Sequence, residues 1–192
     1  MASPRPSTPR IRPRPESDWD DDDRALLARA MGSPDQTPLN IFLTLVNHPR
    51  MLKYWMVFAA GILNKGALPP RDREILILRA GWSCQAVYEW GQHAAIGRQV
   101  GLTDDEIARI PLGPDASGWD PFDATLLRAA DELHADACIS DATWERLQER
   151  YSTEQLIEVP MTVGQYHLVS MTLNSLGVQR EPGVEGFPDG TH

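Results

Sequence analysis

One helix-forming segment, residues 71–82, constrains the fold more than any other part of the chain. Pro69 and Pro70 precede it, and proline suits the entry to a helix. Residues 75–78 within it are four consecutive aliphatic side chains, so the segment is apolar on nearly every side. Helices of this kind are buried on most sides. We therefore expect this helix at the centre of the protein, covered in part by a second subunit because the chain is small.

Start and stop signals for helices recur along the rest of the chain. Prolines, capping residues and terminal glycines predict further helices at residues 20–31, 38–46, 49–63, 85–100, 103–110, 120–135, 140–150 and 152–176. Thr103 with Glu106, and Ser152 with Gln155, have the spacing of capping boxes. No stretch alternates steadily between apolar and polar residues with flanking hairpin turns, so no sheet is expected. The sequence predicts an all-α, single-domain helical bundle.

The two ends of the chain differ from this central part. Residues 1–17 contain five prolines and four arginines, which predicts an extended or disordered arm that an oligomer could order by draping it over a neighbour. Residues 177–192 are rich in glycine and proline and are expected to be irregular. Residues 18–176 are therefore expected to form the one helical domain.

Charge and hydropathy exclude several classes of partner. The chain has 27 acidic and 18 basic residues, a net charge of -9, whereas nucleic acids and anionic membranes attract clustered basic residues. The longest apolar run, residues 55–63, is too short to cross a bilayer, which needs about 20 residues. An apolar signal segment is not seen at the N-terminus. We expect a cytoplasmic protein with no nucleic-acid or membrane partner.

The two cysteines, Cys84 and Cys138, are far apart in the sequence and form no C-x-x-C pair. Two such residues make neither a disulfide framework nor a structural zinc site. We expect each to be a mostly buried thiol without a disulfide.

The helix expected at residues 85–100 carries two ionisable side chains on its apolar face. Glu89 and His93 are four positions apart and therefore lie one above the other. Burying an unpaired charge is unfavourable, so the two should pair with each other or with Glu74. Two interpretations are open at this point. The pair could be an internal bridge that fixes helix packing, or a general acid–base pair that titrates near neutral pH.

Three stretches carry a resemblance to a known family: residues 71–79 (RDREILILR), 88–93 (YEWGQH) and 101–107 (GLTDDEI). They resemble the carboxymuconolactone decarboxylase/alkylhydroperoxidase D superfamily, over about residues 38–176. The resemblance implies an all-helical fold that assembles as a trimer or hexamer. The Glu89-x-x-x-His93 spacing resembles the small decarboxylases, where the histidine belongs to the active site. Glu74 followed by His93 resembles the peroxidase branch, where such a pair serves a proton relay.

One departure from the family bears on the choice between these branches. The peroxidases carry C-x-x-C-x-x-x-H, which would require cysteines at the positions that Ala86 and Glu89 occupy here. A dithiol peroxidase needs a reactive thiolate and a resolving partner. Dithiol peroxidase activity is therefore not expected, and Cys84 alone remains as a redox alternative.

The sequence thus predicts a cofactor-free enzyme of proton-transfer chemistry, acting on a small organic acid or lactone by decarboxylation, isomerisation or lactone opening. His93 would be the acid or base, Glu89 would orient it, and Glu74 would complete the relay. One alternative is an alkylhydroperoxidase-like antioxidant protein that uses Cys84. Another is a non-enzymatic helical oligomer in which the pair only locks an interface.

Other side chains are weaker candidates. Trp90, Tyr88 and His167 could contact a substrate, His167 being the strongest among the polar residues of the last helix. His134 lies near a helix end, where a cation favours the helix dipole. No metal site is expected, because Glu89 and His93 make only two ligands and spacing places no third.

Overall fold

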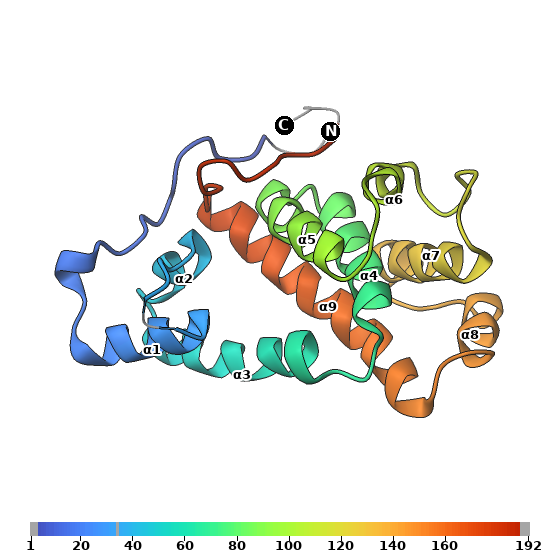
Figure 1. The fold of residues 1–192 in the computed structure, drawn as a ribbon, viewed down its shortest axis with the longest axis horizontal. Coiled ribbons are helices and arrows are strands. Elements are labelled where there is room, and N and C mark those ends of the chain that lie inside the picture. The colour runs from blue at the N-terminus through green and yellow to red at the C-terminus, as the bar shows by residue number, and fades with distance from the viewer. Residues whose placement is uncertain (1–3, 34, 189–192) are drawn as a thin grey trace. The chain divides into compact units, whose positions relative to one another are not determined.

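The computed structural model describes residues 4–33 and 35–188 and contains helices but no strand among them. Figure 1 shows these helices joined by short loops and one longer loop before α7. The all-α fold expected from the sequence is confirmed. The α-helices are α1 (Asp21–Met31), α2 (Asn40–Leu45), α3 (Pro49–Lys65), α4 (Pro70–Ser83), α5 (Val87–Gln99), α6 (Asp104–Arg109), α7 (Pro121–Asp136), α8 (Asp141–Gln148) and α9 (Thr153–Leu176).

The helix starts follow the capping signals of the sequence. The Thr103 side chain caps α6, and Glu106 bonds back to the Thr103 N–H, as a capping box requires. Ser152 and Gln155 form the corresponding pair of bonds at the start of α9. Both predicted capping boxes are therefore confirmed, and the observed helix ends differ from the expected ones by at most two residues.

Contacts divide the chain into two compact units. The first comprises Met1–Lys65 and Thr172–Gly183, and the second comprises Gly66–Met171 and Val184–His192. Helix α9 thus belongs to the second unit up to Met171. The following paragraphs describe each unit by itself.

In the first unit, the N-terminal arm is extended and is bonded to its own chain. The Arg10 N–H donates to the Leu176 carbonyl over 2.8 Å, and the Arg14 N–H donates to the Leu43 carbonyl over 2.8 Å. Residues 4–15 form neither helix nor strand, whereas Glu16–Asp18 at the end of the expected arm form a short 3-10 helix. Contact of this arm with a neighbouring subunit stays a prediction. Residues 1–3 of the predicted arm lie outside the described residues.

In the second unit, α4 is the central helix and packs mainly against α5 and α7. Its aliphatic residues 75–78 are each 0% exposed. The expectation that a second subunit helps to cover this helix was wrong, because helices of the same chain already enclose it. Assembly of the chain is a separate prediction and has to rest on other surfaces.

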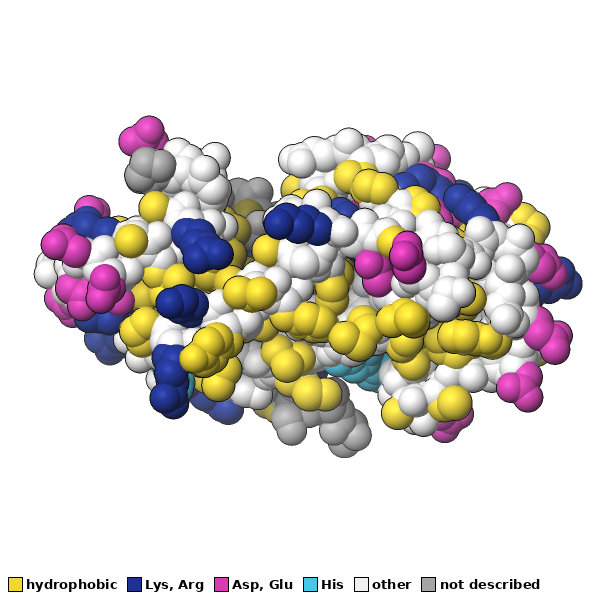
Figure 2. Space-filling model, turned by 90° about the horizontal axis from the view of Figure 1, so that it is seen from below, with side chains coloured by type: hydrophobic (Ala, Val, Ile, Leu, Met, Phe, Trp, Pro, Cys, Tyr) yellow, Lys and Arg dark blue, Asp and Glu magenta, His cyan; other side chains and the backbone are white. Residues whose placement is uncertain are grey.

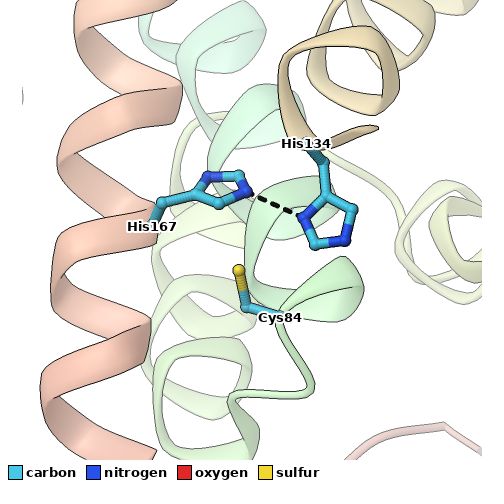
Figure 3. A group of neighbouring side chains, drawn as sticks. All are labelled: Cys84, His134 and His167. Atoms are coloured by element: carbon cyan, nitrogen blue, oxygen red, sulfur yellow. Dashed lines mark hydrogen bonds between the residues drawn. The ribbon is translucent and has the colours of Figure 1, made fainter. Parts of the chain in front are cut away.

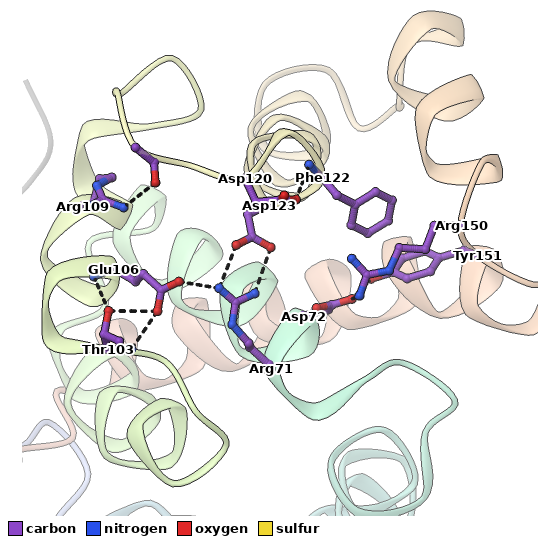
Figure 4. Close-up of polar contacts among 11 residues, drawn as sticks. Arg71, Asp72, Thr103, Glu106, Arg109, Asp120, Phe122, Asp123, Arg150 and Tyr151 are labelled. Carbon is purple, nitrogen blue, oxygen red and sulfur yellow. Dashed lines mark hydrogen bonds and ion pairs between the residues drawn. The ribbon is translucent and has the colours of Figure 1, made fainter.

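The first turn of α4 is fixed by ion pairs and hydrogen bonds in two directions (Figure 4). Arg71 donates two hydrogen bonds to Asp123 of α7, over 2.9 and 2.7 Å, and also pairs with Glu106 of α6. Asp72 accepts a hydrogen bond from the Tyr151 hydroxyl over 2.8 Å. Two-pronged arginine–carboxylate pairs hold orientation well. They therefore fix the rotation of α4 and with it the direction of the side chains that follow.

The C-terminal tail is irregular in its described part, as expected, yet it is packed. The Phe187 ring meets Trp82 edge-on at 4.9 Å between centroids and lies 5.5 Å from the Trp90 ring. A Cβ at Gly91 of α5 would clash with the Glu185 carbonyl, so glycine is needed for the tail to approach this closely. Tail residues 189–192 lie outside the described part.

Candidate functional site

The three acid–base candidates meet between two neighbouring helices. The Glu74 side chain comes from α4, and Glu89 and His93 come from α5. His93 Nδ1 is 2.6 Å from Glu74 Oε2, and His93 Nε2 is 2.9 Å from Glu89 Oε1. The exposed fractions are 0% for Glu74, 4% for Glu89 and 6% for His93. Both ring nitrogens are therefore engaged by carboxylates inside the protein.

Local helix geometry accounts for this arrangement. Residues four apart on a helix have Cβ atoms about 6 Å apart, which brings Glu89 within reach of His93. Gly81 of α4 faces Glu89, and a Cβ placed there would lie 3.5 Å from the Glu89 Cγ. A small residue at this point therefore lets α4 and α5 lie close together, and Glu74 reaches the far side of the imidazole.

Arg73 is a fourth charged member of this cluster, and the sequence reasoning missed it. Its Nε and Nη2 atoms lie 3.0 and 2.9 Å from Glu74 Oε1, and the residue is 8% exposed. Adjacent residues on a helix do not normally face each other, so the sequence neighbour of Glu74 was not an obvious partner. With His93 protonated, two cations balance two carboxylates, which makes burial of the cluster tolerable.

The protonation of His93 follows from its neighbours. Burial lowers the pKa of His93, but the carboxylates of Glu74 and Glu89 together raise it more, to about 10. His93 is therefore an imidazolium at neutral pH and donates a hydrogen bond from each nitrogen. The expectation that pairing outweighs desolvation is confirmed.

Tyr166 of α9 is the aromatic residue that packs against His93. The two rings meet edge-on with their centroids 4.8 Å apart. Burial, with the charges of Glu89 and Glu74, raises the pKa of Tyr166 well above its ordinary value, so the phenol stays neutral. His167 was the expected pocket residue on this helix, but its ring contacts His134 and the Val163 carbonyl. Tyr166 is the residue of α9 that lies beside His93.

The two aromatic candidates of α5 are buried. Trp90 is 1% exposed and lies in an aromatic cluster with Trp82 and Phe187. Tyr88 is 3% exposed. Packing accounts for the burial of Trp90, and contact of either residue with a substrate stays a prediction.

A second cluster of polar side chains lies elsewhere in the same unit (Figure 3). His134 Nδ1 is 2.9 Å from His167 Nε2, and the Cys84 thiol lies beside them. These residues come from α7, α9 and the end of α4, so no sequence spacing connects them. Neither cysteine is in a disulfide, but Cys84 is half-buried and Cys138 is exposed. The expectation of two mostly buried thiols was therefore wrong for Cys138.

The environment of His134 differs from that of His93. Partial burial lowers the pKa of His134, the neighbouring His167 and Arg79 lower it further, and Asp131 opposes them. His134 is therefore mainly neutral at neutral pH. The interpretation of this residue as a cation at the helix end was wrong, because positive neighbours disfavour its charged form.

Two surface hollows lie along α7 and α8, with volumes of about 280 and 350 Å³. Both are lined by Pro121, Thr125 and Arg146. His93 and its carboxylates line neither of them, so these two hollows are separate from the buried cluster.

The arrangement of helices around this cluster defines an alkylhydroperoxidase D-like fold. A peroxidase-related protein from Ralstonia eutropha JMP134, an alkylhydroperoxidase AhpD core, superposes with a TM-score of 0.77 at 18% identity, over 90% of this chain and 93% of that one. One from Silicibacter sp. TM1040 gives 0.72 at 13% identity, over 93% and 92%. The debrominase Bmp8, as a cysteine-to-alanine variant bound to 2,3,4-tribromopyrrole, gives 0.72 at 14% identity, over 90% and 91%. At such low identities the likeness establishes the fold.

Part of the sequence also matches a family model. Residues 49–132 match the carboxymuconolactone decarboxylase family, and this range contains Glu74, Glu89 and His93. This match and the fold both support the resemblance to the carboxymuconolactone decarboxylase/alkylhydroperoxidase D superfamily that the motifs indicated. No curated protein matches the chain. None of the described helices is long and apolar enough to cross a membrane.

Proposed function

We propose that the chain is a cofactor-free acid–base enzyme of the carboxymuconolactone decarboxylase type, acting on a small organic acid or lactone. The observation that carries this proposal is the buried His93 imidazolium held between Glu74 and Glu89. A buried ionisable group whose pKa is shifted by specific charged partners is a recognised mark of a functional site.

Decarboxylation illustrates the chemistry. When a carboxylate on the carbon next to a carbonyl group is lost as CO₂, the electron pair of the broken C–C bond passes to the carbonyl oxygen as an enolate. The enolate carbon must then receive a proton, which His93 would give from Nε2 as the substrate displaces Glu89. Glu74 would keep its hydrogen bond to Nδ1 and hold the ring in place. Solvent would then return the proton to His93.

Isomerisation and lactone opening need the same donor, so the reaction type stays open within this class. The proposal is tested by replacing His93 with glutamine and assaying a panel of lactones and hydroxy acids. Glutamine keeps a hydrogen-bond donor but cannot exchange a proton, so turnover should fall at least about 100-fold. His48→Gln, at an exposed position, is the matched control and should behave as the wild type. Equal turnover in the His93 variant would sink the proposal.

A redox function at Cys84 is the second candidate, favoured by the two imidazoles beside the thiol. A neighbouring histidine can promote the reactive thiolate. Ala86 and Glu89 stand where the dithiol peroxidases have cysteines, so this route would need a thiol from outside the motif. Alkylation of Cys84 should abolish peroxide consumption if this candidate is correct and leave acid–base turnover unchanged if it is not.

The third candidate, a non-enzymatic oligomer, stays open as well. It predicts no ligand-sized cavity beside His93. Soaking crystals with the same panel of lactones and hydroxy acids is the direct test, because density beside the imidazole would exclude a purely structural role.

We also expect the chain to form a homo-oligomer, for which a surface of α9 offers support. Ile157, Met161, Leu168 and Met171 are between 45% and 62% exposed. With Gly164 they follow the alternating spacing of three and four residues that packs helices together. Figure 2 shows one face on which hydrophobic side chains are exposed. The trimer or hexamer itself comes from the family resemblance, and light scattering that gives a monomer near 21.4 kDa would refute it.

A cytoplasmic location without a nucleic-acid partner also stays a prediction.

A further inference from the structure

Three side chains from distant parts of the second unit meet at one point. Cys84 is the C-cap of α4, His134 lies in the last turn of α7, and His167 lies on α9. Each offers one ligand atom, a sulfur or a ring nitrogen, and these atoms all lie within 4.8 Å of one another (Figure 3). We propose that the three residues bind a zinc ion. This site is separate from the His93 cluster and does not depend on its function.

The set of donor atoms selects the class of ion. One thiolate and two imidazoles are borderline-soft ligands, which suit Zn²⁺ and do not suit Mg²⁺ or Ca²⁺, since those ions take oxygen. In a tetrahedral zinc site, Zn–S is about 2.3 Å and Zn–N about 2.0–2.1 Å, which puts the donor atoms about 3.3–3.6 Å apart. The side chains therefore have to move by about 1 Å at most, through small rotations.

The orientation of His167 is already fixed for ligation. Its Nδ1 lies 2.8 Å from the Val163 carbonyl, so Nδ1 carries the hydrogen and donates it. In the neutral ring this leaves the lone pair on Nε2, the atom that faces His134. A ligating histidine nearly always gives its other N–H to a carbonyl or carboxylate in this way. The hydrogen bond to Val163 thus fixes the tautomer and the ring orientation of His167, as an outer-shell partner does in a zinc site.

The contact between the two imidazoles is the one that the ion would replace. His134 Nδ1 lies 2.9 Å from His167 Nε2, a hydrogen bond that needs a proton between the rings. Zinc would displace this proton, and His134 would then carry its hydrogen on Nε2, which is compatible with the exposed position of this residue. The hydrogen bond therefore marks the two nitrogens that would become ligands.

Exposure distinguishes an open site from a closed one. His134 is exposed, and Cys84 and His167 are half-buried, so solvent reaches the cluster from one side. Among the described residues no other histidine, cysteine or carboxylate joins the group. Three protein ligands with an accessible fourth position leave room for water or a small anion, as in zinc sites that exchange ligands.

The test is zinc binding by the full chain after treatment with a chelator and its removal. Calorimetric titration with zinc chloride should give one ion per chain. Cobalt in place of zinc should add a thiolate-to-metal charge-transfer band, which reports on a cysteine ligand directly. Zinc should also slow alkylation of Cys84 while leaving Cys138 unprotected, since Cys138 is exposed and outside the cluster.

Variants separate this site from adventitious binding. Cys84→Ser and His134→Gln should each weaken zinc binding by more than the roughly 10–100-fold that loss of an outer-shell partner costs. Cys138→Ser and His93→Gln should bind zinc as the wild type does, with circular dichroism checking that every variant keeps its helices. Absence of stoichiometric binding, or equal affinity in Cys84→Ser, would overturn the proposal. No step of this test uses turnover, so its failure would leave the proposed function untouched.

Discussion

The second unit contains two histidine clusters that differ in almost every physical respect. His93 is 6% exposed and lies between two carboxylates, which raise its pKa to about 10 against the effect of burial. His134 is exposed, and burial of part of its ring, with His167 and Arg79, lowers its pKa. One imidazole is therefore a proton donor at neutral pH, and the other offers a lone pair.

The difference shows that neighbours, and not depth, decide what a histidine can do. Burial on its own disfavours the imidazolium, yet the deeper histidine is the charged one. Glu74 and Glu89 supply the charge that reverses the effect of burial, and Arg73 keeps the whole cluster neutral. The more exposed cluster has no carboxylate bonded to its rings among the described contacts, so it suits a thiol or a cation instead.

The largest effect should come from removing a charge in the buried cluster. Glu74→Gln would leave Arg73 and His93 with one carboxylate fewer, and breaking a buried ion pair costs about 3–5 kcal/mol of unfolding free energy. Urea unfolding measures the loss. Asp115→Asn is the matched control, because the Asp115 side chain is 85% exposed in its pair with Arg128 and should change stability by less than about 1 kcal/mol. Similar losses of unfolding free energy in the two variants would show that the buried ion pair stabilises the protein no more than the exposed one.

The next prediction concerns pH. The folded pKa of His93 is about 10, above the ordinary 6.5. Its contribution to stability is therefore complete below about pH 6.5 and is lost as the pH rises toward 10, because the folded chain holds a proton that the unfolded chain has released. The unfolding free energy should fall by up to about 1.4 kcal/mol per pH unit in this window.

Urea unfolding at several pH values between 7 and 10 checks this slope. His93→Gln removes the titrating group, so the difference between wild type and variant isolates its contribution. His48→Gln, at an exposed position, should keep the slope of the wild type. If wild type and His93→Gln have the same slope, the carboxylates do not hold the proton as argued.

A smaller effect should follow from neutralising the second carboxylate. Glu89→Gln removes one of the two charges that raise the pKa of His93, so this pKa should fall by about one unit or more. An NMR titration of the imidazole measures it. Glu145→Gln, at an exposed position of α8, is the control. An unchanged His93 pKa in the Glu89 variant would mean that the two groups are not electrostatically coupled.

The same comparison shows how far sequence reasoning reached. The helices and the Glu89–His93 pair could be predicted, because residues three and four positions apart lie on the same face of a helix. The cost of burying a charge named Glu74 as one possible partner of this pair, and the family resemblance supported it, since nothing local connects residues 74 and 93. Arg73 was missed because a sequence neighbour on a helix does not usually share its face.

The second cluster was beyond any such rule. Cys84, His134 and His167 are brought together only by the packing of α4, α7 and α9. Cys84 and His167 were candidates for other roles, and no spacing connected them with each other or with His134. The error about α4 has the same origin. Its apolar sequence showed that it had to be covered, but not whether its own chain or a second subunit would cover it.

The smallest effect should come from the exposed histidine. His134→Gln removes one hydrogen bond at a partly solvated position, which should lower the unfolding free energy by only about 0.5–1.5 kcal/mol when a chelator is present. With zinc in excess the difference should grow, because an ion that binds only the folded state adds RT ln(1 + [L]/Kd) to the stability of the wild type. Thermal unfolding with and without zinc measures both values. If zinc raises the unfolding free energy of the variant as much as that of the wild type, His134 is not a ligand. The contrast would then hold for His93 as a proton donor but not for His134 as a metal ligand.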